Sequence, residues 1–267
     1  MVGPDIANNA LRVTLASLDP SSESRVTAVV GSQNLEFVAG GPVLSTNRTS
    51  DGIPWTGGDL INPITSGECT SGFPVVDSSG VTYNTTAGHC GNTTFQQYGQ
   101  AYGYTYQRLY VNNGVGDQQT ITTYPNYARG YIWTDSSTRT KIDYQANNQY
   151  RGDNMCIDGY VTDESCGSIA ATDQTKNECD QNGHNCINVK GLVWAVSNNG
   201  DYMCQPGDSG GPVYDKNTLY RDLNIRGILS GGGTVAGTGQ LPDPTQCYYT
   251  MNITINFEDG VNVLVGT

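Results

Sequence analysis

The sequence predicts an all-β protein. Glycine is abundant, with 34 residues among 267, and Thr, Val, Tyr and Asn fill short runs between turn-forming residues. Helix-forming stretches are scarce. Short strands that recur between turn signals are typical of a β-sandwich or a β-barrel. Because 36% of the residues are hydrophobic, the chain can bury one large core or two small ones.

The first 50 residues differ from the rest of the chain. Two alternating runs, "LRVTLA" and "NLEFVA", flank the more polar "DPSSESRVTAVVGSQ". This pattern predicts a small strand–helix–strand unit, an α+β extension over residues 1–50. Residues 51–68 are rich in turn-forming residues and nearly free of periodicity, which predicts a linker or an extended arm. Short strands then recur over residues 69–267, which we expect to form the main domain.

Charge and composition exclude several kinds of partner. The formal net charge of −12 argues against nucleic acid, because phosphates need a basic protein face. No apolar stretch is long enough to span a bilayer, so we expect no membrane partner. The N-terminus lacks the charged and apolar regions of a signal peptide, so we expect that any export signal was removed or never existed. We expect a monomer.

Eight cysteines, an even number, indicate disulfides. No two of them form a Cys-x-x-Cys pair, and with two histidines in the chain we expect no zinc site. Disulfides form in oxidising compartments, so the count predicts a secreted protein. Spacing alone leaves the pairing open among Cys69, Cys90, Cys156, Cys166, Cys179, Cys186, Cys204 and Cys247.

The stretch "MCQPGDSGGPVYD", residues 203–215, predicts a tight turn around Ser209. Its three glycines and two prolines disfavour both a helix interior and a regular strand. Such a turn would present the Ser209 hydroxyl beside bare backbone N–H groups. A serine hydroxyl is a weak nucleophile and needs a base, and histidine is the natural base near neutral pH.

The two histidines lie in different settings. His184 lies in the polar "CDQNGHNC", which predicts a solvent-exposed side chain. His89 lies in "TYNTTAGHCG", where a Thr-rich strand runs into small residues and a cysteine. Taken alone, this pattern predicts a half-buried histidine with satisfied hydrogen bonds and no chemical role.

Together, "TAGHC" and "GDSGGP" resemble the chymotrypsin-like serine proteases, and among them the secreted bacterial branch of streptogrisins and alpha-lytic protease. The likeness extends to "GECTSGFPV", "CIDGYVTDESCG", "SGGG" and "DGVNVLV", and covers roughly Gly57 to the C-terminus. It implies two antiparallel β-barrels with the active site in the cleft between them. It also implies a serine endopeptidase that acts on protein or peptide substrates without a metal or cofactor.

The resemblance implies roles for individual residues. Ser209 would form the acyl-enzyme, with His89 as base and then as acid. An aspartate would orient the imidazole. Asp117, at the head of an alternating strand, is favoured over Asp135, which follows its strand; the plain alternative for either is an ordinary turn aspartate. The N–H groups of Gly207 and Ser209 would form the oxyanion hole.

The resemblance also implies that Asp208 is buried and holds this turn in shape. Members of the bacterial branch carry an arginine as the partner of that aspartate, directly after the first cysteine of the Cys156-like pair. This chain has Ile157 there. A buried carboxylate without a partner is costly, so we expect Asp208 to bind backbone donors or another cation.

Three disulfides follow from the same resemblance: Cys69–Cys90, Cys156–Cys166 and Cys204–Cys247. Cys179 and Cys186 then remain and would close a short loop of their own. The first disulfide would pin the strand of His89. The third would tie the turn of Ser209 to the wall of the specificity pocket.

Substrate recognition is predicted from "GILSGGG". This stretch resembles the strand that pairs with the substrate backbone, with Ser230, Gly231 and Gly232 adding the substrate as a further strand. Leu229 stands where glutamate-specific relatives carry a histidine, and no acidic residue stands just before Cys204. We therefore expect an apolar pocket and cleavage after small or medium apolar residues.

Two other functions stay open. A secreted binding or assembly module on a protease scaffold, with weak or no activity, is favoured by Ile157 and by the retained N-terminal segment. A serine esterase would use the same acyl chemistry. We expect residues 1–50 to be the end of a zymogen's pro-region, cut between about Val43 and Gly67, with an integral extension as the alternative. A folding template suits an all-β fold with many non-local contacts, which folds slowly.

Overall fold

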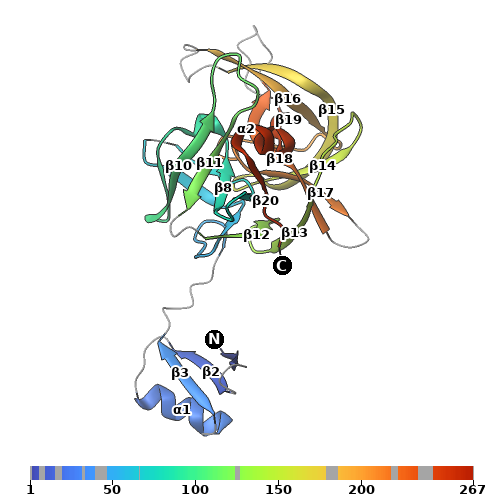
Figure 1. Cartoon of the computed structure of the whole chain (residues 1–267). Helices are drawn as coiled ribbons and strands as arrows, with labels where there is room; N and C mark the ends of the chain where they lie inside the picture. The colour runs from blue at the N-terminus through green and yellow to red at the C-terminus, as the bar shows by residue number, and fades with distance from the viewer. Residues whose placement is uncertain are drawn as a thin grey trace. The chain divides into compact units, whose positions relative to one another are not determined.

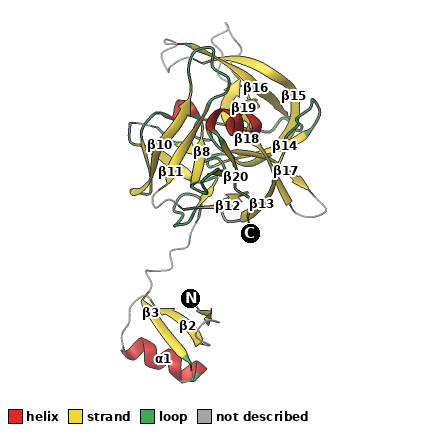
Figure 2. Ribbon diagram, viewed as in Figure 1, coloured by secondary structure: helices red, strands yellow, loops and turns green. Residues whose placement is uncertain are grey.

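The computed structural model describes residues 2–5, 10–15, 20–31, 34–39, 47–65, 67–123, 127–178, 186–217, 222–233 and 243–266. The chain divides into two compact units, Met1–Ser45 and Thr46–Thr267. Strands dominate the second unit, and its helices are short (Figure 2). In the part of the chain that the structure describes, no helix is both long and apolar enough to cross a membrane.

The first unit is a three-stranded sheet with one helix (Figure 1). Strand β1 (Val2–Asp5) pairs antiparallel with β2 (Ala10–Leu15), and β2 pairs parallel with β3 (Leu35–Ala39). Parallel neighbours need a crossover connection, and α1 (Pro20–Val30) supplies it. The predicted strand–helix–strand pattern is confirmed, and β1 adds a strand that the sequence analysis did not predict.

The second unit holds two large sheets. The first sheet has the strand order β20-β7-β8-β11-β10-β9-β5-β6, and the second has the order β17-β14-β15-β16-β19-β18-β13-β12-β4. Strand β17 also pairs with β18, which closes the second sheet into a barrel. Among the described strands, the pairings within these two sheets are antiparallel except β4–β12 and β13–β18. The predicted all-β class with two barrels is confirmed.

The strands of the first sheet are β5 (Leu60–Pro63), β6 (Cys69–Thr70), β7 (Pro74–Asp77), β8 (Thr82–Thr86), β9 (Thr94–Gln97), β10 (Gln100–Leu109), β11 (Gln118–Thr123) and β20 (Val261–Val263). Those of the second are β4 (Trp55–Gly57), β12 (Ala128–Trp133), β13 (Arg139–Gln145), β14 (Asn154–Gly159), β15 (Asp163–Glu178), β16 (Ile187–Ser197), β17 (Pro212–Asn217), β18 (Asp222–Gly233) and β19 (Asp243–Met251). The helices are the 3-10 turn η1 (Gly88–Cys90) and α2 (Asn252–Asp259).

Residues 51–68, expected to be a linker or an extended arm, contribute a strand to each sheet. Strand β4 pairs with β12 of the second sheet, and β5 pairs with β6 and β9 of the first. Trp55 is buried, and a Cβ on Gly57 would lie 1.9 Å from the carbonyl oxygen of Gly72. Strands of three and four residues are too short to show an alternating pattern in the sequence, which is why periodicity did not reveal them.

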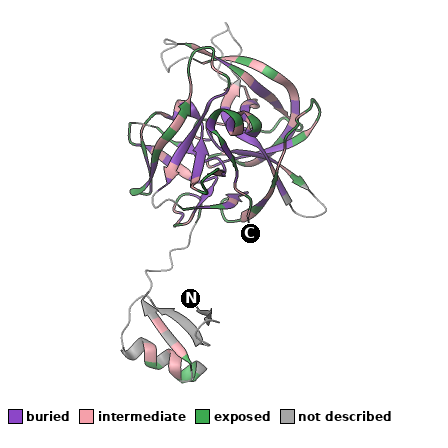
Figure 3. Ribbon diagram, viewed as in Figure 1, coloured by how far each residue is buried: buried purple, intermediate pink, exposed green. Residues whose placement is uncertain are grey.

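Buried hydrophobic side chains form three clusters, and much of the two sheets is buried (Figure 3). One cluster joins the two sheets: it contains Val75 and Tyr83 of the first together with Ile132 and Ile225 of the second. The second cluster lies within the second barrel, and the third is drawn mainly from the first sheet. Because one close-packed cluster has members from both sheets, the sheets are held in one relative position, and so are the residues at their junction.

Disulfides close three of the loops around this junction. The pairs Cys69–Cys90, Cys156–Cys166 and Cys204–Cys247 are all formed, as the resemblance implied. Cys186 is also disulfide-bonded. Its predicted partner, Cys179, lies outside the described residues, as does His184.

Candidate active site

His89 is held by the short turn η1, directly after strand β8. A Cβ on Gly88 would lie 2.9 Å from the carbonyl oxygens of Leu109 and Gln118, so a larger residue at this position would clash with the backbone. The disulfide from Cys90 ties the other end of η1 to β6. The turn therefore fixes the backbone on both sides of His89, whose side chain is 27% exposed.

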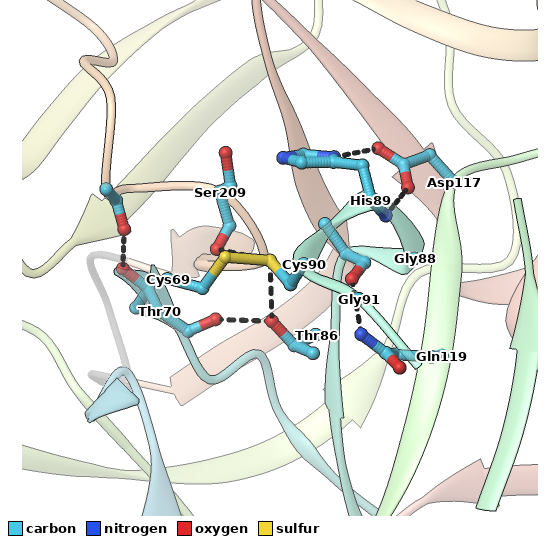
Figure 4. Close-up of a disulfide and its surroundings, with 12 residues drawn as sticks. Cys69, Thr70, Thr86, Gly88, His89, Cys90, Gly91, Asp117, Gln119 and Ser209 are labelled. Carbon is cyan, nitrogen blue, oxygen red and sulfur yellow. Dashed lines mark hydrogen bonds and ion pairs between the residues drawn. A yellow bond between two sulfur atoms is a disulfide. The ribbon is translucent and has the colours of Figure 1, made fainter. Parts of the chain in front are cut away.

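Asp117 is fully buried and contacts His89 twice. One carboxylate oxygen accepts the backbone N–H of His89 at 2.8 Å, and the other lies 2.6 Å from the ring nitrogen Nδ1 (Figure 4). The Ser230 hydroxyl donates to the same carboxylate at 2.7 Å. Asp135 instead accepts the backbone N–H groups of Ser137 and Thr138 within its own turn. Of the two candidate aspartates, the structure brings Asp117 to His89.

The charge of Asp117 governs the protonation of His89. Burial disfavours the charged imidazolium, but the Asp117 carboxylate outweighs this effect, and the pKa of His89 is raised above its usual value. Burial likewise disfavours the charged form of Asp117. The charge and hydrogen bonds of His89 outweigh this effect of burial, so the pKa of Asp117 is lowered. With Nδ1 bonded to a carboxylate, the neutral imidazole keeps Nε2 as an acceptor.

Ser209 lies in the predicted tight turn, which packs against the segment that carries His89. A Cβ on Gly210 (φ +88°) would lie 2.0 Å from the Thr86 hydroxyl oxygen. The Ser209 carbonyl accepts the N–H of Thr70 at 2.8 Å. Figure 4 shows the ring nitrogen of His89 that is turned away from Asp117 pointing toward the Ser209 side chain. The structure thus brings Ser209, His89 and Asp117 together.

Asp208 is fully buried, and its carboxylate is satisfied by the backbone. One oxygen accepts the N–H groups of Val161 at 2.8 Å and Thr162 at 3.1 Å. The other accepts the N–H of Gln205 at 2.8 Å and the hydroxyl of Thr162. The expectation that Asp208 finds backbone donors is confirmed. Ile157, where the bacterial branch has arginine, lies in the core of the second barrel.

The predicted substrate strand lies at the end of β18. Leu229 is fully buried in the core of the second barrel, and the Ser230 hydroxyl is bonded to Asp117. The backbones of Gly231 and Gly232 are partly exposed, and Gly231 has a φ of +139°, which favours glycine.

Two charged residues that the sequence did not reveal as part of this site are Lys176 and Glu178. Both lie at the end of the long strand β15. The neighbouring strand β16 is hydrogen-bonded to the loop before Asp117: the N–H of Lys190 donates to Gly114 O at 2.9 Å, and the N–H of Gly116 donates to Lys190 O at 2.8 Å. Strands β15 and β16 pair as an antiparallel hairpin of the second barrel, and these bonds attach the end of that hairpin to the first barrel.

Glu178 binds several groups of the site at once. Its carboxylate accepts the Lys176 ammonium at 2.8 Å and lies 3.0 Å from the Ser230 hydroxyl oxygen, whose one proton is shared between Glu178 and the closer Asp117. Burial and this carboxylate also raise the pKa of Tyr110. Lys176 Nζ lies 3.2 Å from where a Cβ on Gly231 would stand. The only signal in the sequence was the spacing of two, which places Lys176 and Glu178 on one face of a strand.

Two groups of side chains in the described ranges are close enough to suggest a metal site. In one, Cys156 and Cys166 are joined as a disulfide and are not free to ligate. In the other, His89, Asp117 and Glu178 lie within 4.8 Å of one another, but Asp117 is already bonded to His89 and Ser230. Neither arrangement is a prepared metal site.

Comparison with known proteins gives the same fold class. No family model matches the sequence. Serine protease 2 of Streptomyces fradiae is 29% identical over 191 residues, which cover 68% of this chain and 97% of that protein.

Solved structures are similar over most of the second unit's length. Thermobifida fusca protease A has a TM-score of 0.60 at 21% identity, over 79% of this chain and 98% of that one. Nocardiopsis protease has a TM-score of 0.57 at 22% sequence identity, and the match covers 78% of this chain and 97% of that one. A serine protease specific for glutamic acid has a TM-score of 0.62 at 21% sequence identity, and the match covers 78% of this chain and 100% of that one. At these identities the structures show the fold, and together with the Streptomyces relative they confirm the resemblance to bacterial chymotrypsin-like serine proteases.

We expect Glu178→Gln to lower the pKa of His89, because it removes a negative charge that favours the imidazolium. Lys176→Met should raise this pKa, because the ammonium disfavours the imidazolium. NMR titration of the imidazole protons measures both shifts, and a His184→Gln background leaves His89 as the one histidine observed. Glu164→Gln, in a carboxylate bonded to Tyr214, is the control and should leave the pKa unchanged. An unshifted pKa in the first two variants would contradict the prediction.

Proposed function

We propose that this chymotrypsin-like serine endopeptidase hydrolyses peptide bonds through an acyl-enzyme on Ser209. The observation that carries the proposal is the pairing of a buried Asp117 with the partly exposed His89, whose ring nitrogen Nδ1 lies 2.6 Å from the carboxylate, beside the turn that presents Ser209. A buried carboxylate bonded to Nδ1 holds the imidazole in the tautomer that can accept a proton at Nε2.

In the first half of the reaction the Ser209 Oγ attacks the carbonyl carbon of the substrate, and its proton moves to Nε2 of His89. Asp117 stabilises the imidazolium that forms. His89 then gives the proton to the leaving amine, the C–N bond breaks, and the acyl group stays on Ser209. Water attacks this ester in the second half, again with His89 as base, and releases the acid and the free serine.

The N–H groups of Gly207 and Ser209 are proposed to bind the oxyanion. Gly207 has a φ of +106°, and a Cβ there would lie 2.8 Å from side-chain atoms of Tyr160 and Val161. A side chain at this position is therefore disfavoured both by conformation and by space. Each such donor is worth about 3 kcal/mol in the transition state when it is held in place beforehand.

The backbone of Ser230, Gly231 and Gly232 is proposed to pair with the substrate as an added strand. The partly exposed backbone of the two glycines supports this role. The satisfied carboxylate of Asp208 removes one of the reasons for considering an inactive binding module. Disulfides around the site support secretion.

A fluorophosphonate should label Ser209 stoichiometrically, because His89 removes the hydroxyl proton during attack. Ser209→Ala and His89→Ala should lose both labelling and peptide hydrolysis, whereas Ser79→Ala, in an exposed turn, should match the parent. Mass spectrometry of the labelled peptide gives the site. A folded parent that is not labelled would contradict the proposal and favour the binding module, and labelling with cleavage of esters alone would favour the esterase.

We propose that the enzyme prefers apolar residues before the scissile bond. Leu229 and Met203 are both fully buried in the same hydrophobic cluster, and Tyr202 and Met203 precede Cys204 without an acidic residue. We expect the substrate pocket to form beside these side chains, which carry no charge to pair with a basic or acidic substrate residue.

Leu229→Ala should shift the preference toward larger apolar residues, because it removes volume from the pocket wall. It should also lower the free energy of unfolding by about 2–5 kcal/mol, as expected for a buried leucine. Cleavage-site profiling with a peptide library measures the preference, and Val193→Ala, in the same cluster, is the control for lost stability alone. Dominant cleavage after Arg, Lys or Glu in the parent would refute the apolar pocket.

The N-terminal unit is proposed to be a pro-region that is removed on maturation. The window expected from the sequence, residues 43–67, overlaps the second unit, which begins at Thr46 and contains β4 and β5. Removal of those strands would leave one edge of β9 and one edge of β12 unpaired, since β9 would keep only β10 and β12 would keep only β13. We therefore predict that the cut falls between residues 43 and 48. N-terminal sequencing and intact mass of the secreted protein test this, and an active form that still begins near Met1 would identify an integral extension instead.

A further inference from the structure

Arg48 is a buried arginine to which the proposed mechanism assigns no role. Its side chain is 2% exposed. Nε and one terminal nitrogen donate to the carbonyl of Gly58 at 3.1 and 3.0 Å. The two terminal nitrogens also bind both carboxylate oxygens of Asp158 at 3.0 and 2.5 Å. All three nitrogens of the guanidinium are thus engaged within the protein.

The remaining acceptors of Arg48 lie at the last residue of β14 and the first residue of β15, on either side of the turn that joins these strands. One nitrogen donates to the carbonyl of Gly159 at 3.0 Å and to the carboxylate of Asp163 at 2.8 Å. With Asp158, Arg48 therefore binds both ends of the six-residue segment 158–163, which we term the clamped loop. Arginine suits this task because its planar fork can reach several acceptors at once.

The middle of the clamped loop holds the turn of Ser209 from the other side. The N–H groups of Val161 and Thr162 donate to Asp208, the residue between Gly207 and Ser209. A Cβ on Gly159 would lie 2.2 Å from the Asp208 carboxyl group, so the two segments are in direct contact.

A second connection runs through Thr70. The N–H of Tyr160 donates to the Thr70 hydroxyl at 3.1 Å, and that hydroxyl donates to the carbonyl of Gly207 at 3.0 Å. Both residues of the proposed oxyanion hole are thus adjacent to groups that the clamped loop binds.

We infer that Arg48 is a positioning residue for the oxyanion hole, acting through the clamped loop and Asp208. The inference rests on the proposed function, because it assigns Gly207 and Ser209 to the oxyanion hole. Arg48 touches no reacting atom. Without it the N–H groups of Val161 and Thr162 lose the support that keeps them aimed at Asp208, and the two oxyanion donors are no longer held in place beforehand, which is where their effect on rate arises.

The test uses Arg48→Lys and the double variant Arg48→Met/Asp158→Asn in the full chain. Lysine keeps a charge for Asp158 but cannot bind Gly58, Gly159 and Asp163 together. The double variant removes both buried charges, so no unpaired ion is left to prevent folding. Arg139→Lys is the matched control, since Arg139 pairs with the buried Asp51 from the same N-terminal stretch and does not contact the clamped loop.

We expect kcat to fall by at least about tenfold in both Arg48 variants, with KM unchanged. The loss should not exceed the roughly 10²–10³-fold loss that follows removal of an oxyanion donor. The affinity for a peptidyl boronic acid, which binds as a tetrahedral adduct, should fall by the same factor. Far-UV circular dichroism confirms that each variant is folded. A folded variant that keeps the parental kcat would overturn the inference, and a rise in KM alone would assign Arg48 to substrate binding.

Hydrogen exchange separates this inference from the proposed function. Amides of residues 158–163 and 205–211 should exchange faster in Arg48→Lys than in the parent and in Arg139→Lys. Faster exchange in Arg48→Lys, found together with a parent that no fluorophosphonate labels, would keep the clamp and reject the acyl-enzyme. A labelled, active parent whose exchange and kcat are unaffected by Arg48→Lys would keep the acyl-enzyme and reject the clamp.

Discussion

The buried carboxylate of Asp117 is the point at which both barrels meet the candidate site. From the first barrel it accepts the backbone and ring nitrogens of His89, and from the second it accepts the Ser230 hydroxyl. The N–H of Asp117 donates to Thr250 on β19, which also belongs to the second barrel. A buried charge is stable only while donors surround it, so the barrels cannot shift relative to each other without unpairing this carboxylate. The orientation of His89 depends on that constraint.

Close backbone contact holds Ser209 at the same junction. Gly210 lies against Thr86 and Thr70, and Gly88 lies against the strands on either side of Asp117. A methyl group at Gly210 would force the turn of Ser209 away from Thr86 and Thr70, and a methyl group at Gly88 would push the turn of His89 away from the strands that flank Asp117. The cluster of buried side chains shared by both sheets stabilises this arrangement by holding the two sheets together.

Charged groups from distant segments complete the site. The Asp208 carboxylate accepts hydrogen bonds from backbone N–H groups and the Thr162 hydroxyl rather than from a neighbouring arginine, and Arg48 binds the loop that supplies most of those donors. The paired strands β15 and β16 bring Glu178 to Ser230 and thereby add a second carboxylate near His89. Burial and the Lys176 ammonium oppose the charged imidazolium of His89. The charges of Asp117 and Glu178, together with the hydrogen bond to Asp117, outweigh them, and the pKa of His89 is raised.

What the sequence determined is local. The Gly and Pro content around Ser209 requires a tight turn, and the alternating strand after Asp117 places that residue at a strand start, so both could be recognised from a few neighbours. The disulfide pairs and the role of His89 came from resemblance, and the structure has the pairs as implied. The tertiary structure alone decided the partners of Arg48 and Glu178, because Asp158 is 110 residues from Arg48 and Ser230 is 52 from Glu178. The tertiary structure also decided that Asp208 has its hydrogen bonds satisfied although Ile157 stands where the bacterial branch has an arginine. Backbone N–H groups are present at every residue except proline, so the sequence cannot show which of them will point at a buried carboxylate.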